Sequence, residues 1–470
     1  MKFAAQWLAS VTSGTWNGGE VASNDVAIDS RTLPKGAIYL ALKGERFDGH
    51  DFVPAGALAG AAAAIVARDQ LERVRTLVGR ADYPLLVVAD TLVALQQLGH
   101  AHRERLHKTV FVAVAGSNGK TTTKEMVASV LAQHGRTYRT TGNLNNHIGV
   151  PLSLLRVDEA HAFAVIETGM NHPGELLALG RILAPDHALI TTIQPEHMEG
   201  LGSLENVARA EGEIFLTVKP NGTMIFPADE PLALQVALPP RSDTKTLGFG
   251  ERSDAGVRLS HYEISEHTRA TYSCALGEIV VRLPQIGKHN ALNAGAAVAV
   301  GVVLGLTADQ IRQGLEATPL VDRRLRIHHT EKLLVLDDCY NANPGSMGAA
   351  LEVLRVLGEG KRKIAVLGDM LELGEHAPDA HRELGREAVK VGVTLLIVLG
   401  NFAKLVTDAA LAEGFSPEAI AYAPAVPPLL AWLRPRLQQG DVVLVKGSRG
   451  MKMERIVEAL GVKTAVEAGH

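Results

Sequence analysis

An apolar run leads into a glycine-rich turn at Phe111-Val112-Ala113-Val114-Ala115-Gly116-Ser117-Asn118-Gly119-Lys120-Thr121-Thr122, within a chain of 470 residues. Residues 122–133 then show the helical spacing of Met126, Val130 and Leu131. Strand, glycine-rich loop and helix in that order let backbone N–H groups surround phosphate oxygens. The same order predicts a parallel sheet with helices on its faces.

The loop Gly116–Thr122 has the residue types that bind a nucleoside triphosphate. Its glycines permit a tight turn, and the N-terminus of the following helix favours an anion. Lys120 can reach the β- and γ-phosphates, and the Thr121 hydroxyl can join a Mg²⁺ shell. The loop is shorter than the usual eight-residue pattern, because Val114 stands where the first glycine is expected. A chance Gly-Lys-Thr turn is the alternative, and the flanking strand and helix disfavour it.

Composition excludes several classes of protein. Lys and Arg number 47 against 51 Asp and Glu, a net charge of −4 that disfavours general binding of nucleic acid or anionic membranes. Two cysteines, Cys274 and Cys339, exclude a disulfide scaffold, and we expect both to be packed side chains. Ala291–Leu306 is too short to span a bilayer and predicts a buried helix, and residues 1–10 predict an amphipathic helix. We expect a cytoplasmic protein with no membrane span.

The length predicts two to four domains, and pattern divides the chain into three blocks. We expect an α/β protein with a small mixed α/β unit at residues 1–85, a central P-loop parallel-sheet unit of the ATPase type at 86–316 and a Rossmann-like unit at 317–470. A helix is expected at Ala55–Ala64. The expected strands are Ala37–Leu42, one beginning at Ile65, Phe111–Ala115, Ala162–Ile166, Ala188–Ile193, Leu333–Leu336, Ile364–Leu367, Leu395–Leu399 and Val442–Val445.

Two polar side chains follow strands that we expect to flank the phosphate loop. Glu167 ends one strand, and His197 lies just beyond another. Sites in open α/β sheets form at the carboxyl ends of strands, so both could approach the loop. A carboxylate suits Mg²⁺, whereas imidazole is an unusual ligand for it. From spacing alone, Glu167 could equally cap a helix, and a surface position is the favoured interpretation of His197.

Several motifs, taken together in order and spacing, resemble the Mur ligase family, and most closely its MurF type, over nearly the whole chain. They are Asp29-Ser30-Arg31, Leu42–Phe52, the phosphate loop, Thr141–Asn146, Glu167–Met170, His197–Gly200, His289–Asn293, Asp337–Pro344 and Leu367–Gly374. The segments Tyr340–Pro344 and Gly368–Gly374 are similar to the MurF type in particular.

The resemblance implies an ATP-dependent ligase of peptidoglycan synthesis. It implies that D-alanyl-D-alanine is added to UDP-N-acetylmuramoyl-tripeptide through an acyl phosphate, with ATP and Mg²⁺ as cofactors. The first domain would bind the UDP end, the second ATP, and the third would close over the site with the incoming dipeptide. The third residue of the peptide, diaminopimelate or lysine, is left open, and a monomer is expected.

The resemblance also implies roles for individual residues. Catalysis would involve Lys120, Glu167, His197 and Arg324, although the adjacent Arg323 could be the true match. Nucleotide contacts would come from Gly116, Ser117, Asn118, Gly119, Lys120, Thr121, Thr122, Asn290, Asn293 and Asp338. The UDP-linked substrate would meet Ser30, Arg31, Lys43, His50, Asn145 and Asn146. Independently of the resemblance, the segment Lys446–Arg449 follows the expected strand Val442–Val445. A cation and a hydroxyl there, such as Lys446 and Ser448, could hold the dipeptide's carboxylate, or the segment could be a solvated basic loop.

Two positions depart from the family pattern. Many relatives carry a carbamylated lysine where this chain has Glu211. We expect Thr121 and Glu167 to bind Mg²⁺, and Glu211 to serve with His197 as the anionic ligand of a second Mg²⁺. Relatives usually have Asn before Ile193, whereas this chain has Thr192, which puts an amide contact there in doubt. The alternatives are another Mur-type or folylpolyglutamate-type ligase, or a nucleotide-switch NTPase.

Overall fold

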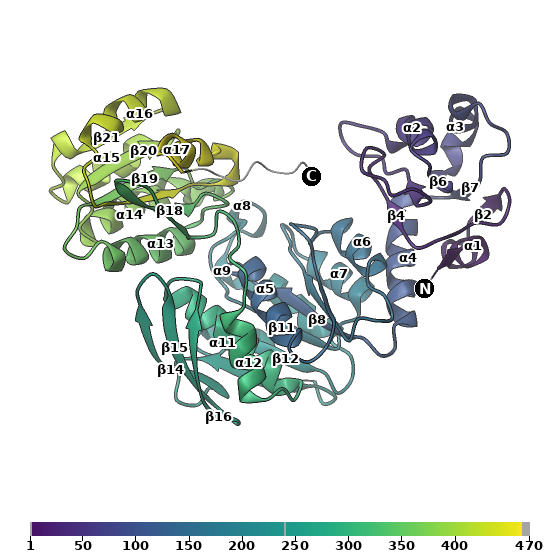
Figure 1. Cartoon of the computed structure of the whole chain (residues 1–470), viewed down its shortest axis with the longest axis horizontal. Helices are drawn as coiled ribbons and strands as arrows, with labels where there is room; N and C mark the ends of the chain where they lie inside the picture. The colour runs from purple at the N-terminus through teal and green to yellow at the C-terminus, as the bar shows by residue number, and fades with distance from the viewer. Residues whose placement is uncertain (1, 239–240, 463–470) are drawn as a thin grey trace.

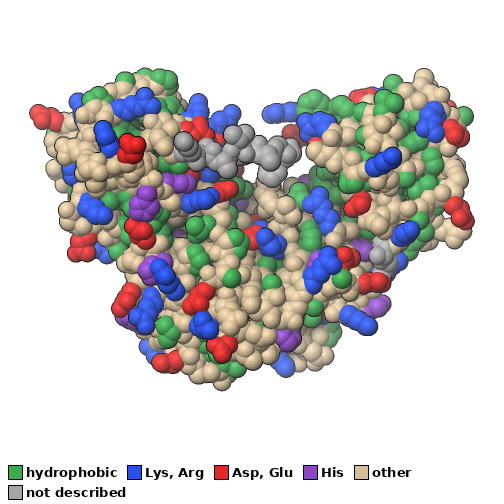
Figure 2. Space-filling model, in the orientation of Figure 1, with side chains coloured by type: hydrophobic (Ala, Val, Ile, Leu, Met, Phe, Trp, Pro, Cys, Tyr) green, Lys and Arg blue, Asp and Glu red, His purple; other side chains and the backbone are tan. Residues whose placement is uncertain are grey.

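The structure is a computed structural model that describes residues 2–238 and 241–462. It is an α/β protein built on three sheets of five, nine and six strands, with a separate two-stranded pair near the N-terminus. Figure 1 shows the three units in chain order, with the first and the last on opposite sides above the central one. Figure 2 shows a hollow between these two upper lobes. The expected fold class is confirmed.

The first unit carries a five-stranded sheet in the order β2-β7-β6-β5-β4. Its strand β7 runs to Val88, so a boundary at residue 85 falls at the start of a strand of this sheet. The expected helix Ala55–Ala64 is wrong in its second half, because the chain turns at Gly60 with φ +95° and then enters β6. The elements are β1 (Phe3–Ala4), α1 (Ala5–Thr12), β2 (Thr15–Asn17), β3 (Ala22–Ser23), β4 (Val26–Ala27), β5 (Ile38–Leu40), α2 (Val53–Leu58), β6 (Ala63–Ala67), α3 (Leu71–Val78) and β7 (Leu85–Val88).

The central unit carries a nine-stranded sheet in the order β16-β15-β14-β13-β12-β11-β8-β10-β9. The strands from β9 to β14 pair in parallel, whereas β14, β15 and β16 form an antiparallel meander that we did not expect from the sequence. The strands are β8 (Val110–Ala115), β9 (Thr137–Arg139), β10 (Phe163–Glu167), β11 (His187–Ile190), β12 (Thr223–Pro227), β13 (Lys245–Gly250), β14 (Val257–Ile264), β15 (Thr268–Cys274) and β16 (Gly277–Leu283).

Helices cover both faces of this sheet. Alternate side chains of β8 point to opposite faces, and those on both faces are apolar, so both faces need to be covered. Phe111, Ala113 and Ala115 pack in the core beneath α6, α7, α9 and α10, while Val112 and Val114 pack beneath α5, α11 and α12. The helices are α4 (Thr91–Arg105), α5 (Lys120–Leu131), α6 (Gly149–Leu155), α7 (Glu175–Leu183), α8 (Met198–Leu201), α9 (Leu204–Gly212), α10 (Pro231–Ala237), α11 (Lys288–Val303) and α12 (Ala308–Glu316).

The alanine- and valine-rich helix is confirmed as α11, whose side chains from Asn293 to Gly301 are all buried. Within the described residues, no helix combines the length and the apolar character that crossing a bilayer requires.

The last unit carries a six-stranded sheet in the order β17-β18-β22-β19-β20-β21, parallel except at β17. The final strand β22 is inserted between β18 and β19, as in doubly wound folds. The elements are β17 (Arg326–His329), β18 (Leu333–Asp338), α13 (Pro344–Leu357), β19 (Lys363–Gly368), α14 (Ala377–Lys390), β20 (Leu395–Leu399), α15 (Ala403–Ala412), β21 (Ile420–Ala423), α16 (Val426–Leu433), β22 (Asp441–Lys446) and α17 (Glu454–Ala459).

Candidate active site

A cavity of about 650 Å³ lies between the central and last units. Three neighbouring strands, β11, β8 and β10, end at its floor. The loop after β8 carries Lys120, β10 ends in Glu167, and the segment after β11 carries His197. All three side chains line the cavity, and Arg324 and Tyr340 line it from the last unit. The carboxyl ends of parallel strands thus bring together residues that are far apart in the sequence.

The phosphate loop has glycine at two positions that other residues could not occupy. Gly116 has φ +119° and Gly119 has φ +81°, in the region that favours glycine. A Cβ atom on Gly116 would collide with Thr191, and one on Gly119 would collide with the side chain of Asn293. The loop is therefore packed closely against β11 on one side and helix α11 on the other.

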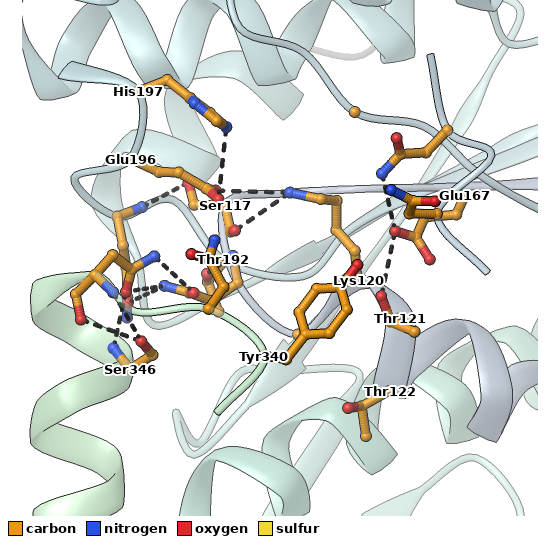
Figure 3. A pocket seen from close by; sticks show the side chains of 18 of the residues that line it. Ser117, Lys120, Thr121, Thr122, Glu167, Thr192, Glu196, His197, Tyr340 and Ser346 are labelled. Atoms are coloured by element: carbon orange, nitrogen blue, oxygen red, sulfur yellow. Dashed lines mark hydrogen bonds and ion pairs between the residues drawn. The ribbon is translucent and has the colours of Figure 1, made fainter. Parts of the chain in front are cut away.

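The Lys120 ammonium folds over its own loop, and Figure 3 shows it directed toward Ser117 and Glu196. It donates to the carbonyl oxygen of Gly116 at 2.6 Å, and it lies 3.6 Å from Glu196 Oε2. Burial lowers the pKa of Lys120, but the charges of Glu196, Glu211 and Glu167 outweigh this effect and raise it above its usual value. Lys120 is therefore a fixed positive charge at the mouth of the loop.

Thr121 and Glu167 face each other on the other side of the loop (Figure 3). Thr121 Oγ1 donates to Glu167 Oε1 at 3.3 Å, and Asn145 Nδ2 donates to the same oxygen at 3.1 Å. Glu167 Oε2 is buried without a hydrogen-bond partner, although the Lys124 ammonium lies 3.7 Å away. The Thr121 hydroxyl next to a buried carboxylate oxygen that lacks a hydrogen-bond partner fits a hard divalent cation such as Mg²⁺.

Glu211 reaches the loop from α9 and is 3% exposed. Its Oε2 atom accepts a hydrogen bond from the backbone N–H of Gly116 at 2.7 Å. Burial raises the pKa of Glu211 to about 7, against the opposing effect of Lys120. The carboxylate therefore supports the first residue of the phosphate loop.

His197 has a left-handed backbone, with φ +52°, that directs its ring across to the last unit. Its Nδ1 atom lies 2.9 Å from Glu372 Oε2, and its Nε2 atom lies 3.6 Å from Glu196 Oε1. Burial lowers the pKa of His197, but the hydrogen bond with Glu372 and the charge of Glu196 raise it overall. Within the described residues, no group of three or more His, Cys, Asp and Glu side chains is arranged to hold a metal by itself.

An amide cluster joins the phosphate loop to the last unit. The side chains of Asn118 and Asn343 exchange two hydrogen bonds, of 3.1 and 2.8 Å, and Asn118 Nδ2 also donates to Gln194 Oε1 at 2.8 Å. Asn343 is at the same time the N-cap of α13, where it accepts from the Ser346 N–H. Thr192 contributes through its hydroxyl, which accepts from the Asn118 N–H at 3.3 Å. Amide contacts at the loop are thus made by Gln194 and Asn343.

The two candidate arginines have different environments. Arg324 lines the cavity, its guanidinium stacks 4.0 Å from the Tyr340 ring centre, and its Nε atom is buried without a hydrogen-bond partner. Arg323 has φ +59° and lies 3.7 Å from Glu454. Of the two, Arg324 is the residue placed to meet a ligand in the cavity.

Asn290 and Asn293 lie at the start of α11 and line the same cavity. Asn290 Nδ2 donates to the Ile286 carbonyl at 2.8 Å, and Asn293 Nδ2 donates to Asn290 Oδ1 at 3.1 Å. Both side chains are 5% exposed. Their side chains bond to each other and to the Ile286 carbonyl rather than capping the helix, and they also form part of the cavity wall.

Other candidate residues of the last unit are engaged with one another. Lys446 Nζ lies 2.6 Å from Asp338 Oδ2 and donates to the Asn341 carbonyl at 2.9 Å. Ser448 Oγ donates to the Ala342 carbonyl at 3.2 Å and accepts from the Leu371 N–H at 2.9 Å. Lys446 and Asp338 line the large cavity, and Ser448 lines a smaller one beside it.

The candidate residues for the UDP-linked substrate divide between two units. Asn145 and Asn146 line the large cavity, and Asn146 also accepts from the backbone N–H of Gly149 at 2.9 Å. Ser30, Arg31, Lys43 and His50 belong to the first unit and line none of the described cavities. Arg31 pairs with Asp29, while His50 is 2% exposed and bonds to Asp48 and to the Ala67 N–H.

Several lining residues were missed from the sequence. Gln194, Glu196 and Glu230 follow strands of the central sheet, so a closer inspection of strand ends could have found them. Tyr340 and Glu372 reach the cavity only because the last unit packs against the central one. Glu372 has φ +64°, a conformation that turns its side chain toward His197.

Family comparisons agree with this architecture. The family model described as "Mur ligase family, catalytic domain" matches residues 24–103, "Mur ligase middle domain" matches 114–301, and "Mur ligase, glutamate ligase domain" matches 323–449. The UDP-N-acetylmuramoyl-tripeptide–D-alanyl-D-alanine ligase of Bacillus subtilis is 38% identical, over 93% of this chain and 92% of its own. The enzyme of the same name from Escherichia coli is 37% identical, over 96% and 97%.

Solved structures give the same result. A crystal structure of MurF from Acinetobacter baumannii superposes with a TM-score of 0.87 at 33% identity, covering 98% of this chain and 99% of the other. MurF ligase from Thermotoga maritima, in complex with ADP, superposes with a TM-score of 0.80 at 28% identity, covering 93% and 96%. With its phosphate loop, its strand-end carboxylate and its third unit facing them, the chain belongs to the Mur ligase family.

Proposed function

We propose that this chain joins D-alanyl-D-alanine to UDP-N-acetylmuramoyl-tripeptide at the expense of ATP, giving ADP, phosphate and the pentapeptide precursor of peptidoglycan. The protein is an ATP-dependent ligase by family. One observation carries the proposal: Lys120, Thr121 and Glu167 face Arg324 across a single cavity, in a chain that matches ligases of this activity over nearly its full length.

The chemistry explains why charged groups are gathered here. A carboxylate is a poor electrophile, so the tripeptide's terminal carboxylate first attacks the γ-phosphorus of ATP, and ADP leaves. The amine then attacks the carbonyl carbon of the acyl phosphate, the C–O bond to phosphate breaks, and the nitrogen loses a proton. Phosphoryl transfer depends on positioning and on neutralising charge, which are the roles of Lys120 and Arg324.

We assign a first Mg²⁺ to Thr121 and Glu167, supported by the buried Glu167 Oε2 atom that lacks a hydrogen-bond partner. Bound there, Mg²⁺ would supply positive charge beside the phosphates, and it normally keeps several waters. The phosphate loop residues Gly116, Ser117, Asn118, Gly119 and Thr122 would surround the phosphates, and Asn290, Asn293 and Asp338 would contact the rest of the nucleotide.

A second Mg²⁺ is proposed at His197 and Glu211. The Glu211 carboxylate carries a negative charge without any reaction with carbon dioxide, so it would replace the carbamylated lysine of relatives. The Glu211→Ala variant should lose activity and change the dependence of rate on Mg²⁺ concentration. Full activity with an unchanged Mg²⁺ dependence would remove Glu211 from the metal site and leave it as a support for Gly116.

The remaining assignments concern substrates and assembly. We propose that the first unit binds the UDP end through Ser30, Arg31, Lys43 and His50, and that Asn145 and Asn146 face the muramoyl-peptide. We propose that the loop Lys446–Arg449 of the last unit binds the dipeptide. The closing of this unit over the site would protect the acyl phosphate from water. The enzyme would act as a monomer in the cytoplasm, where its nucleotide substrates are made.

The test is phosphate release with ATP, Mg²⁺ and UDP-N-acetylmuramoyl-tripeptide, with one amine added at a time. The panel is D-alanyl-D-alanine, D-glutamate, L-alanine, L-lysine and meso-diaminopimelate. Release only with D-alanyl-D-alanine, together with a product of the expected mass, is the predicted result. Release with another amine would assign a different ligase step. Amine-independent hydrolysis by a folded sample would favour a nucleotide switch.

A further inference from the structure

A second, smaller cavity of about 70 Å³ adjoins the large one at the boundary between the central and last units. His197, Glu372 and Arg449 line both cavities, so the two spaces are continuous along their walls. The phosphate loop does not line the smaller cavity. It is therefore a place where a second ligand could lie beside the nucleotide without displacing it.

The smaller cavity carries opposite charges on side chains that are open to solvent. The Arg449 side chain is 49% exposed, and its Nη1 atom donates to Glu454 Oε1 at 3.0 Å. The Glu372 side chain is 64% exposed and faces His197. Leu371, which is 42% exposed, and the buried Ala342 supply an apolar part of the wall. A small zwitterion with methyl side chains would match these three features.

Lys446 and Ser448 have a different task from Arg449. The Lys446 side chain is 2% exposed and is bound to Asp338, so little of it is open to solvent. Ser448 joins the Leu371 N–H to the Ala342 carbonyl and so fixes the segment that carries Glu372. These two residues shape the loop, and Arg449 is the cation of that loop that lies at the cavity with half its side chain exposed.

We propose that Arg449 binds the terminal carboxylate of the incoming dipeptide and that Glu372 faces its ammonium group, an inference that rests on the proposed function. A guanidinium has five N–H donors in a planar fork, so it can serve Glu454 and a second carboxylate together. Glu454 positions Arg449, because it holds the guanidinium at the cavity wall. The amine end is thereby directed toward His197 and the central unit, where the acyl phosphate forms.

The carboxylate half of the proposal is tested with Arg449→Gln and two substrates, D-alanyl-D-alanine and its C-terminal amide. The wild-type enzyme should prefer the acid. The variant should raise KM for the acid by at least about tenfold, lose the preference for acid over amide, and keep its KM for ATP. Arg449→Lys should recover part of the preference. Arg455→Gln is the matched control, because Arg455 is exposed, bonds to the Lys452 carbonyl and lines neither cavity.

The ammonium half is tested with N-propionyl-D-alanine, which keeps the carboxylate and lacks the ammonium group. Its inhibition constant should rise in Arg449→Gln and stay unchanged in Glu372→Gln, whereas KM for the dipeptide should rise in both. An Arg449→Gln enzyme that still prefers the acid would overturn the proposal. A wild-type enzyme that releases no phosphate with D-alanyl-D-alanine would instead overturn the proposed function, so the two failures are distinguishable.

Discussion

The central and last units both place charged residues at the carboxyl ends of parallel strands, but they use those residues differently. At the central sheet, Glu167 has a buried carboxylate oxygen without a hydrogen-bond partner, and Lys120 lies over its own loop, 3.6 Å from Glu196. At the last sheet, Asp338 and Lys446 end neighbouring strands and bind each other, while Asp369 accepts hydrogen bonds from two backbone N–H groups. The carboxyl end of a strand indicates where a site can form. The partners of the charged residues there show whether those residues are available to a ligand or stabilise the fold.

The sharpest test of the central unit is Lys120→Ala. Removing the one loop cation that can neutralise phosphate charge should lower kcat by about a hundred- to a thousandfold. The fold should persist, because the hydrogen bonds and the ion pair described for this side chain are made with its own loop and with Glu196. The measurement is phosphate release, with circular dichroism and thermal unfolding as controls. Undiminished release would refute the role of Lys120.

The last unit should respond in the opposite way to loss of its strand-end lysine. Lys446→Ala leaves Asp338 buried without its cation, which should cost about 3–5 kcal/mol of stability. The double variant Asp338→Asn/Lys446→Met should recover much of this loss, since no lone charge remains. Thermal unfolding checks both. The proposed difference between the two sheets would be wrong if Lys446→Ala had the same Tm as the wild type and only raised KM for the dipeptide.

The two adjacent arginines provide a narrower comparison across the unit boundary. Arg324→Gln should reduce kcat/KM for ATP by about 10–100-fold, because Arg324, stacked on Tyr340, lines the cavity in which we propose that the phosphates bind. Arg323→Gln should leave kcat/KM for ATP within about twofold, since Arg323 points to Glu454. Steady-state kinetics with varied ATP distinguish them, and equal losses in both variants would contradict the assignment.

The smallest expected effect concerns Glu230, which accepts the Ile193 N–H at 2.6 Å beside the cavity. Burial raises the pKa of Glu230 to about 7 from a usual 4.5. A carboxyl whose folded pKa is raised stabilises the fold below its unfolded pKa, and this stability is lost as pH rises through 7. Wild-type Tm should therefore fall from pH 5 to pH 8 relative to Glu230→Gln, by the equivalent of roughly 2 kcal/mol. Parallel curves would show that Glu230 does not titrate there.

Sequence patterns revealed the central unit better than the last one. Lys120, Thr121 and Glu167 could be placed because a contiguous motif and an apolar strand fix their positions. The antiparallel strands β14–β16 were missed, since their alternating, half-exposed residues lack an apolar run. The helix at Ala55–Ala64 was half wrong, because an alanine-rich run fits a helix and a buried strand equally well.

The cavity-lining residues of the last unit could not be identified from the sequence, for a physical reason. Lys446 looked available because it follows an apolar strand, and its partner became evident only once β22 lay beside β18 in register. Glu372 and Arg449 depend on the packing of segments that lie far apart in the chain. Arg323 and Arg324 are adjacent in sequence, and only the folded structure shows that one lies near Glu454 and the other lines the cavity.

The reciprocal bonds between Asn118 and Asn343 have a thermodynamic consequence. One amide belongs to the loop that we propose surrounds the phosphates, and the other caps the first turn of helix α13. Any ligand that binds the loop more tightly when this pair is formed must stabilise the contact between the two units by the same free energy. Nucleotide binding and the orientation of the two units are then linked equilibria, so a change in one can be detected by measuring the other.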